Sequence, residues 1–246
     1  MPDMYNSILL TGGTGRLGQE LQRLLPGLIA PTRSEMDISQ PHTIRAALDR
    51  YTPQILVHAA AYTDVAGAER DHTACWQTNV VGTRHLVCAL RQRGGRLVYI
   101  STDYVFYGDR GLYKEEDPVG PTRNYYALSK LVAEEIVRLV PDHLVIRTSF
   151  RPRDWPYPVA FQDVYTSQDY VDIIAPEIGL AIAHCGDIPY QTLHIATERK
   201  SVYELAKRRK PDVQPGSKQQ ASVALPDDIS LDTTRWQQLK AHWHSA

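Results

Sequence analysis

Three glycines near the start of the chain limit its fold more than any other feature. Gly12, Gly15 and Gly18 are spaced three apart, after the apolar run 7–10 and before the helical pattern 16–25. A glycine at the first position permits a tight turn, one at the second lets backbone N–H groups approach a pyrophosphate, and one at the third lets the helix pack closely on the strand. The start of the helix adds partial positive charge. This stretch therefore predicts a dinucleotide-binding turn, although glycines at this spacing also occur in purely structural turns.

Short apolar runs alternate with helical patterns along the first 150 residues. We predict strands over 7–10, 28–30, 54–58, 96–100, 143–147 and 191–195, and helices over 16–25, 42–51, 74–93, 126–140, 167–184 (broken at Pro176), 201–209 and 233–241. This alternation predicts an α/β fold, a Rossmann-type doubly wound parallel sheet with helices on both faces. We expect a dinucleotide-binding core over 1–150 and a small substrate-binding portion over 151–246, with 211–220 as a loop.

Composition excludes several kinds of protein. The 246 residues carry 27 basic and 28 acidic side chains, so the charge does not favour binding to nucleic acid. No apolar run approaches the length of a membrane span, and the first residues do not resemble a secretion signal. The histidines show no metal-ligand spacing, and the three cysteines are expected to be buried reduced thiols. These features predict a cytoplasmic protein with no membrane or nucleic-acid partner and no metal.

The choice of cofactor depends on the end of the second predicted strand, about 20 residues after the first glycine. Arg33 lies where an NAD-selective protein usually has an acidic residue, and it could bind the 2′-phosphate of NADP. Glu35 keeps NAD possible, and Arg33 could also be an ordinary surface residue. The sequence therefore favours NADP(H) and leaves NAD(H) open.

A hydroxyl, a phenol and an ammonium form the candidate catalytic group. Thr102 follows the predicted strand 96–100, and ligands bind at the carboxyl ends of strands in such sheets. Tyr126 and Lys130 are one helical turn apart on one face. An ammonium near a phenol should lower the phenol's pKa towards neutral pH, which suits proton transfer to or from a carbonyl oxygen. We predict that Tyr126 transfers the proton, Thr102 holds the oxygen, and Lys130 supports both phenol and cofactor.

A second Tyr-x-x-x-Lys match, Tyr203 with Lys207, lies far from the glycines and has no hydroxyl at a strand end before it. We interpret it as a structural pair on a helix. Only the first match belongs to a complete set of groups.

These motifs resemble those of the extended short-chain dehydrogenase/reductase superfamily. Several segments are similar, more narrowly, to dTDP-4-dehydrorhamnose reductases: residues 32–38, 58–63, 101–106, 124–131, 147–149 and 229–235. The resemblance implies reduction of the 4-keto group of a deoxy-sugar nucleotide, and it implies a possible homodimer.

The resemblance also implies roles for individual residues. Those implied or predicted to bind the cofactor are Gly12, Thr14, Gly15, Arg16, Leu17, Arg33, Asp37, Ile38, Ala59, Ala60, Ala61, Tyr62, Asn79, Tyr126 and Lys130. Those implied to face the substrate are Thr102, Asp103, Tyr104 and Phe150.

Position 104 separates two chemistries within this superfamily. Related 4,6-dehydratases carry Thr-Asp-Glu, whereas this chain has Tyr104 at the third position. A phenol with a reference pKa of about 10 is a poor base near neutral pH, so reduction is favoured over elimination. Two alternatives stay open: a nucleotide-sugar epimerase, which would share every motif named, and a non-catalytic NAD(P)-binding regulatory or scaffold subunit.

The resemblance weakens after residue 149. Phe150 replaces an expected Trp, a proline-rich stretch over 151–158 replaces a Val-Tyr-Gly segment, and Tyr107 replaces an expected Asp. The chain is also several tens of residues shorter than typical family members. The identity of the sugar is therefore the least determined part of the prediction.

Overall fold

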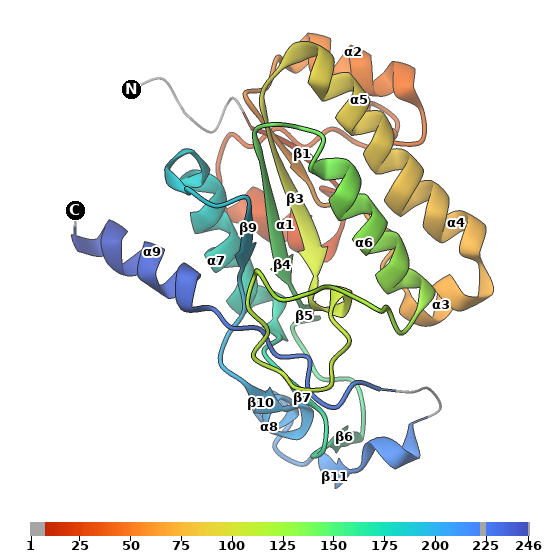
Figure 1. Ribbon diagram of the computed structural model, residues 1–246, viewed down its shortest axis with the longest axis vertical. Coiled ribbons are helices and arrows are strands. Elements are labelled where there is room, and N and C mark those ends of the chain that lie inside the picture. The colour runs from red at the N-terminus through yellow and green to blue at the C-terminus, as the bar shows by residue number, and fades with distance from the viewer. Residues whose placement is uncertain (1–7, 222–224, 246) are drawn as a thin grey trace.

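A five-stranded parallel sheet forms the centre of the protein (Figure 1). The computed structural model describes residues 8–221 and 225–245. The strand order is β1-β2-β3-β4-β9, with bounds Ile8–Thr11, Ile55–His58, Arg96–Thr102, His143–Thr148 and Thr192–His194. The predicted α/β class and Rossmann-type architecture are therefore confirmed.

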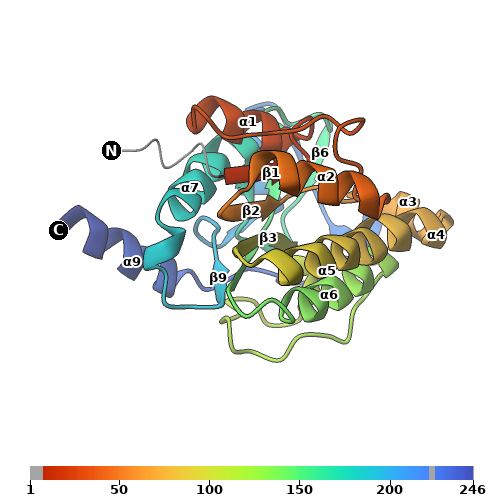
Figure 2. The ribbon, with the colours of Figure 1, turned by 90° about the horizontal axis from the view of Figure 1, so that it is seen from above.

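Helices cover both faces of the sheet (Figure 2). On one face, α1 (Arg16–Leu24), α7 (Val171–Ala183) and α9 (Thr234–Ser245) share an apolar cluster with β1, β4 and β9. On the other, α2 (Pro41–Tyr51), α5 (Thr83–Arg93) and α6 (Tyr125–Val137) form the second cluster. Because both faces are covered, the strands are apolar throughout rather than alternating.

The predicted strand 28–30 forms only an isolated bridge between Ile29 and Leu9. Ile29 accepts a hydrogen bond from the amide of Leu10 and donates one to Ile8. After α1 the chain thus runs along one side of β1 at Ile29, and it then crosses to form β2 on the other side of β1. Such a reversal point in a parallel sheet is where ligands bind.

Two helix predictions need correction. The pattern 74–93 is not one α-helix: after α3 (Val65–Arg70) and α4 (His72–Trp76) come a π-helix over Gln77–Gly82 and then α5. The pattern 167–184 begins as a helix only at Val171, and Pro176 does not break it. Pro176 has no N–H to donate, so α7 lacks one backbone hydrogen bond. The packing of its buried side chains on α1 and the sheet stabilises the helix by more than this loss.

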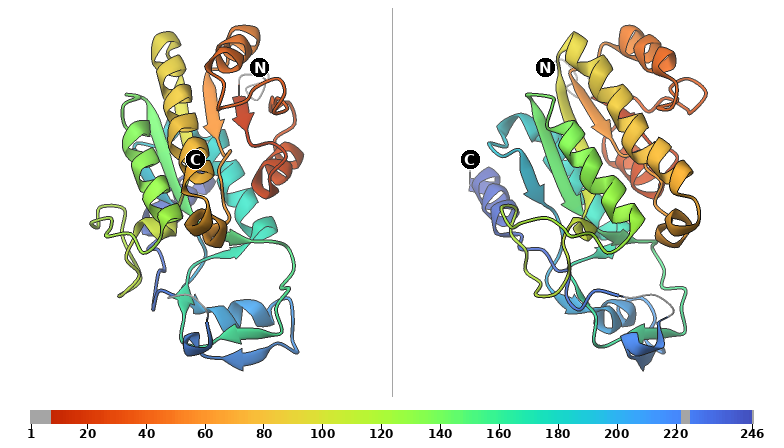
Figure 3. Two further views of the ribbon diagram at one scale, coloured as in Figure 1. Left: turned by 90° about the vertical axis from the view of Figure 1, so that its right-hand side faces the viewer. Right: turned by 45° about the vertical axis from the view of Figure 1, so that its right-hand side comes forward.

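Residues after β4 divide between two places. α7, β9 and α9 join the central sheet and its helices, while the other elements form a smaller lobe beyond the carboxyl ends of the strands (Figure 3). That lobe contains β5 (Phe150–Arg151), β6 (Val159–Phe161), β7 (Tyr165–Thr166), β8 (Asp169–Tyr170), β10 (Lys200–Ser201), α8 (Val202–Lys207) and β11 (Gln214–Gly216). The expected loop 211–220 thus includes a strand, β11, paired with β6. The boundary at residue 150 remains a prediction.

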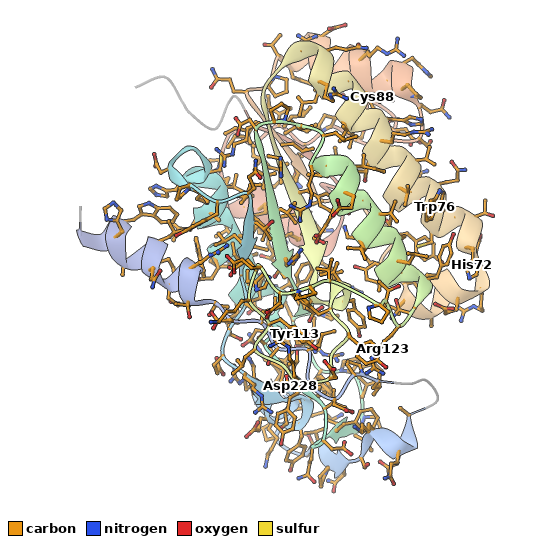
Figure 4. All side chains as sticks on the ribbon, in the orientation of Figure 1. His72, Trp76, Cys88, Tyr113, Arg123 and Asp228 are labelled. Atoms are coloured by element: carbon orange, nitrogen blue, oxygen red, sulfur yellow. The ribbon has the colours of Figure 1, made fainter. Side chains whose placement is uncertain are left out.

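The loop after β3 is attached to the C-terminal segment. Tyr113 bridges to Leu231, and Asp109 bridges to Asp228. Figure 4 shows Tyr113 and Asp228 near each other below the sheet. Tyr113 also stacks on Phe106, with ring centroids 4.4 Å apart. The C-terminal residues therefore stabilise a loop that begins at the site described below.

Cys75 and Cys185 are buried, as expected, but Cys88 is exposed on α5, and all three thiols are free. Cys88 follows the buried Val87 on the side of α5 that faces away from the sheet, so the expectation of burial was wrong there. Within the described ranges no helix is long and apolar enough to span a bilayer.

Candidate active site

The glycine turn forms a cradle between β1 and α1. Gly12 has φ +79°, and a Cβ there would lie 2.7 Å from the amide nitrogen of Ala60. A Cβ on Gly18 would overlap the carbonyl oxygen of Gly12. Gly15 is the N-cap of α1, with no side-chain cap, and the first turn of the helix contains no acidic residue. The first N–H groups of α1 are therefore available to an anion such as a pyrophosphate.

A cleft of about 1040 Å³ runs from this turn to the ends of β3 and β4. Most of the predicted site residues line it: Gly12, Thr14, Gly15, Arg16, Leu17, Arg33, Asp37, Ile38, Ala59, Ala60, Ala61, Tyr62, Thr102, Tyr104, Tyr126, Lys130 and Phe150. Asn79 and Asp103 do not line the cleft; each is 1% exposed.

The adenosine end predicted for the cleft carries Arg33, Asp37 and Ile38. The side chain of Arg33 is 85% exposed, and its Nε donates to the carboxylate of Asp37 at 3.2 Å. The side chain of Ile38 packs closely against Gly82, where a Cβ would lie only 2.8 Å from it. An exposed guanidinium at the mouth of the cleft can pair with a phosphate.

A buried histidine that sequence reasoning missed holds the end of β2. His58 lies between two hydroxyls, with Nδ1 2.8 Å from Oγ1 of Thr11 and Nε2 2.9 Å from Oγ1 of Thr83. Burial lowers the pKa of His58 to about 3, so the ring is neutral at physiological pH. Thr11 in turn accepts from the amide of Ala60 at 3.3 Å. His58 therefore fixes the backbone that follows β2 in the cleft wall.

Asn79 acts through other residues. It lies in the π-helix, and its Oδ1 accepts from the amide of Tyr62 at 2.8 Å while Nδ2 donates to the Tyr62 carbonyl at 3.2 Å. Nδ2 also donates to Oγ of Ser129 at 2.8 Å, and Ser129 donates to the carbonyl of Tyr126 at 2.7 Å. Asn79 thus joins the loop after β2 to the helix that carries Tyr126 and Lys130. Single-turn π segments of this kind are frequent at functional sites.

The side chains of Thr102 and Tyr126 lie at the end of β3, where both line the cleft and where the Thr102 hydroxyl is near enough to lower the pKa of the Tyr126 phenol. Thr102 also caps the short helix that follows, accepting from the amide of Tyr104 at 3.2 Å. The rings of Tyr104 and Tyr126 pack edge to face, with centroids 6.2 Å apart. The structure thus brings a hydroxyl and a phenol to one point on the cleft wall.

Lys130 lies behind this pair. Its Nζ donates to the carbonyl of Ile100 at 2.8 Å and lies 4.1 Å from the ring centre of Tyr99, and the residue is 2% exposed. Burial lowers the pKa of Lys130 to about 7, although the nearby carboxylate of Glu134 acts in the opposite direction. The protonated amine has three donor positions, and the carbonyl of Ile100 takes one of them, so a ligand in the cleft can accept another.

The expected lowering of the Tyr126 pKa does not occur in the cleft as it stands. Burial raises the pKa of Tyr126, and a negative charge on Asp103 acts in the same direction. The nearby Thr102 hydroxyl lowers the Tyr126 pKa but does not outweigh the effect of burial. Tyr126 is accordingly a protonated phenol near neutral pH, the form that donates a proton rather than the form that accepts one.

A buried ion pair supports the same region from behind. Glu134 accepts from Nη2 of Arg147 at 2.9 Å and from Oγ of Ser101 at 2.5 Å. Both charged side chains are almost completely buried. Glu134 thus links α6 to Ser101 in β3 and to Arg147 in β4. Separating the three elements would leave buried charges uncompensated, so this contact fixes their relative position.

Asp103 is buried beside Thr102, whose hydroxyl donates to Oδ1 at 3.1 Å. Burial raises the pKa of Asp103 from 3.8 to about 7, and hydrogen bonds from Thr102 and Ser149 only partly oppose this. In the unfolded chain the same group is ionised above about pH 4. Between these values the folded state therefore binds one proton more than the unfolded state.

We expect this extra proton to make stability depend on pH. Because the folded state binds more protons, the free energy of unfolding should fall between pH 4 and pH 7, by up to about 1.4 kcal/mol per pH unit from this group. Urea unfolding of the wild type and Asp103→Asn at several pH values measures the difference. A slope unchanged by the substitution would contradict a raised Asp103 pKa.

Comparison with known proteins agrees with this geometry. A family described as RmlD substrate binding domain matches residues 6–179. A dTDP-4-dehydrorhamnose reductase from Aggregatibacter actinomycetemcomitans is 30% identical over 198 residues, covering 77% of this chain and 67% of the relative. The chain belongs to the dTDP-4-dehydrorhamnose reductase family.

Other members of this family show how much of this chain, and of each relative, the similarity covers. The spore coat polysaccharide biosynthesis protein SpsK of Bacillus subtilis is 37% identical over 150 residues, covering 58% of this chain and 52% of SpsK. The chain spans about half the length of several of the relatives it matches. The crystal structure of a dTDP-4-dehydrorhamnose reductase from Bacillus anthracis in complex with NADP has a TM-score of 0.82 at 26% identity, and it covers 94% of this chain and 91% of that one.

Proposed function

We propose that the chain is an NADPH-dependent reductase of the 4-keto group of a deoxy-sugar nucleotide. The observation that supports this most is the meeting of the Thr102 and Tyr126 hydroxyls in the wall of a cleft that begins at the glycine turn, with Lys130 behind them. Relatives named for reduction of dTDP-linked keto sugars support the choice of substrate class.

The glycine cradle fits a dinucleotide, because Gly12 and Gly18 let the turn pack tightly against Ala60 and α1, while the first N–H groups of α1 stay open to a pyrophosphate. We assign Gly12, Thr14, Gly15, Arg16 and Leu17 to the pyrophosphate. Arg33 would hold a 2′-phosphate, with Asp37 and Ile38 beside the adenine, and Ala59, Ala60, Ala61 and Tyr62 would line the nicotinamide half. Asn79 would act by holding Tyr62. NADP in the Bacillus anthracis relative favours NADPH over NADH.

A nicotinamide held beside residues 59–62 would supply hydride to the carbonyl carbon. Tyr126, a protonated phenol, donates its proton to the carbonyl oxygen, so that the ketone becomes a secondary alcohol. Thr102 steadies that oxygen, and its hydroxyl can turn from Asp103 to do so. The charge of Lys130 favours the phenolate that remains on Tyr126 after proton transfer.

Thr102, Tyr104 and Phe150 would contact the sugar, and Asp103 would contribute through Thr102. Burial raises the pKa of Tyr104 as well, so this phenol cannot act as the base that elimination requires. The assignment of 151–246 as the substrate-binding portion remains our proposal. The homodimer and the cytoplasmic location implied by the sequence remain predictions.

An assay with dTDP-4-keto-6-deoxy sugars tests this function. Purified protein and NADPH should lose nicotinamide absorbance when the sugar nucleotide is added, in proportion to the alcohol formed. An unchanged absorbance with both the rhamnose-type and the glucose-type keto sugar would contradict the proposed reduction, and would favour a non-catalytic role.

A further inference from the structure

Arg151 is a cleft residue for which the family resemblance provides no role. It follows Phe150 in β5, where the chain departs from the Val-Tyr-Gly segment that the resemblance implies. β5 begins two residues after β4 and pairs with β8, with Arg151 opposite Tyr170. This pairing holds the backbone of Arg151 at the cleft wall, beside Phe150 and Pro152.

The guanidinium of Arg151 lies in no close ion pair with a carboxylate of the described residues. Its Nε is buried and makes no hydrogen bond, and none of the ion pairs formed by residues 8–221 and 225–245 includes it. Burial lowers its pKa, which indicates how much water the group has lost. A desolvated charge without a partner is costly, so this guanidinium is suited to pair with an anion that enters the cleft.

The neighbouring Arg153 shows the opposite arrangement. It forms a two-pronged ion pair with Glu20 on α1, with distances of 2.7 and 2.8 Å from Nη2 and 3.0 Å from Nε. Arg153 does not line the cleft. The charge of Arg153 is thus already paired with a carboxylate of the protein, whereas that of Arg151 is not.

Contacts around Arg151 place its charge on the substrate side of the cleft. The guanidinium lies over the ring of Trp155, 4.6 Å from its centre, which fixes its position. Its charge interacts with Tyr104 and Asp103, the two residues that follow Thr102.

We infer that Arg151 binds an oxyanion of the substrate, either a phosphate of the nucleoside diphosphate or a carboxylate on the sugar. A guanidinium pairs with either group through two parallel hydrogen bonds. This inference rests on the proposed function for the substrate class, but it concerns binding and is tested without turnover.

Calorimetric titration with dTDP, UDP-glucose and UDP-glucuronate tests the inference in wild type, Arg151→Gln, Arg151→Lys and the matched control Arg153→Gln. If the anion is the diphosphate, Arg151→Gln should weaken all three ligands about tenfold or more. If it is a sugar carboxylate, the wild type should prefer UDP-glucuronate to UDP-glucose, and Arg151→Gln should remove only that preference. Arg151→Lys should retain part of the affinity, and Arg153→Gln should bind as the wild type does.

Three results would overturn the inference. One is unchanged affinity for all ligands in a folded Arg151→Gln protein, and another is a wild type that binds none of them. The third is weaker NADPH binding alone, which would place Arg151 at the cofactor. Failure of the proposed reduction would instead appear as a lack of NADPH consumption by a wild type that still binds nucleotides through Arg151.

Discussion

Replacing Tyr126 with phenylalanine is expected to lower turnover by about 100- to 10,000-fold, the range typical of removing a general acid. The substitution removes the one phenol that meets the Thr102 hydroxyl in the cleft wall. It retains the ring and its edge-to-face contact with Tyr104, so affinity for NADPH should change little. Single-turnover rates of NADPH oxidation and NADPH titration measure the two quantities separately.

Tyr203→Phe is the matched control for this substitution. Tyr203 also precedes a lysine by four residues on a helix, but it packs in the lobe cluster with Val202 and Ala206 rather than in the cleft. We expect its turnover to equal that of the wild type. Equal turnover of Tyr126→Phe and Tyr203→Phe would contradict the role given to Tyr126.

A methyl group on Gly18 should greatly weaken NADPH binding. In Gly18→Ala the new Cβ would overlap the carbonyl oxygen of Gly12 and press on the Cα of Gly13. All of these are backbone atoms, so the turn and α1 must move apart. Overpacking of about 1–3 kcal/mol in the binding conformation would raise the dissociation constant by about 5- to 150-fold.

Gly186→Ala is the control for this change, because a Cβ at Gly186 meets nothing within 4 Å. Fluorescence titration with NADPH and thermal unfolding should be done on both variants. The control should match the wild type in both measurements. A folded Gly18→Ala protein that binds NADPH with wild-type affinity would show that the cradle does not hold the cofactor.

The sequence allowed correct prediction of features that depend on neighbouring residues. The glycine turn, the apolar strands and the Tyr126–Lys130 spacing all follow from local geometry, and the structure places Thr102 beside Tyr126 as expected. The helix break at Pro176 was wrong because packing on α1 outweighs the missing hydrogen bond. The strand at Ile29 was shorter than expected because it pairs with β1 through one bridge only.

Features that depend on distant residues were not predictable from one sequence. His58 has a role only because Thr11 and Thr83 lie on either side of it. The effect of Lys130 on Tyr126 was misjudged because burial, which local spacing does not show, dominates both pKa values. Arg151 is distinguished from Arg153 by its place in the cleft wall and by the absence of a described partner such as Glu20, neither of which the sequence shows.

Deuterium transfer from labelled NADPH tests the central claim most directly, namely that Thr102 and Tyr126 hold a keto oxygen while hydride reaches the attached carbon. The protein should be incubated with NADPH carrying two deuterium atoms at nicotinamide C4 and with a dTDP-4-keto-6-deoxy sugar, and the product analysed by nuclear magnetic resonance. We predict deuterium at C4 of the sugar and none at the other carbons. A product without deuterium at C4, or recovery of the unreduced ketone, would contradict the account.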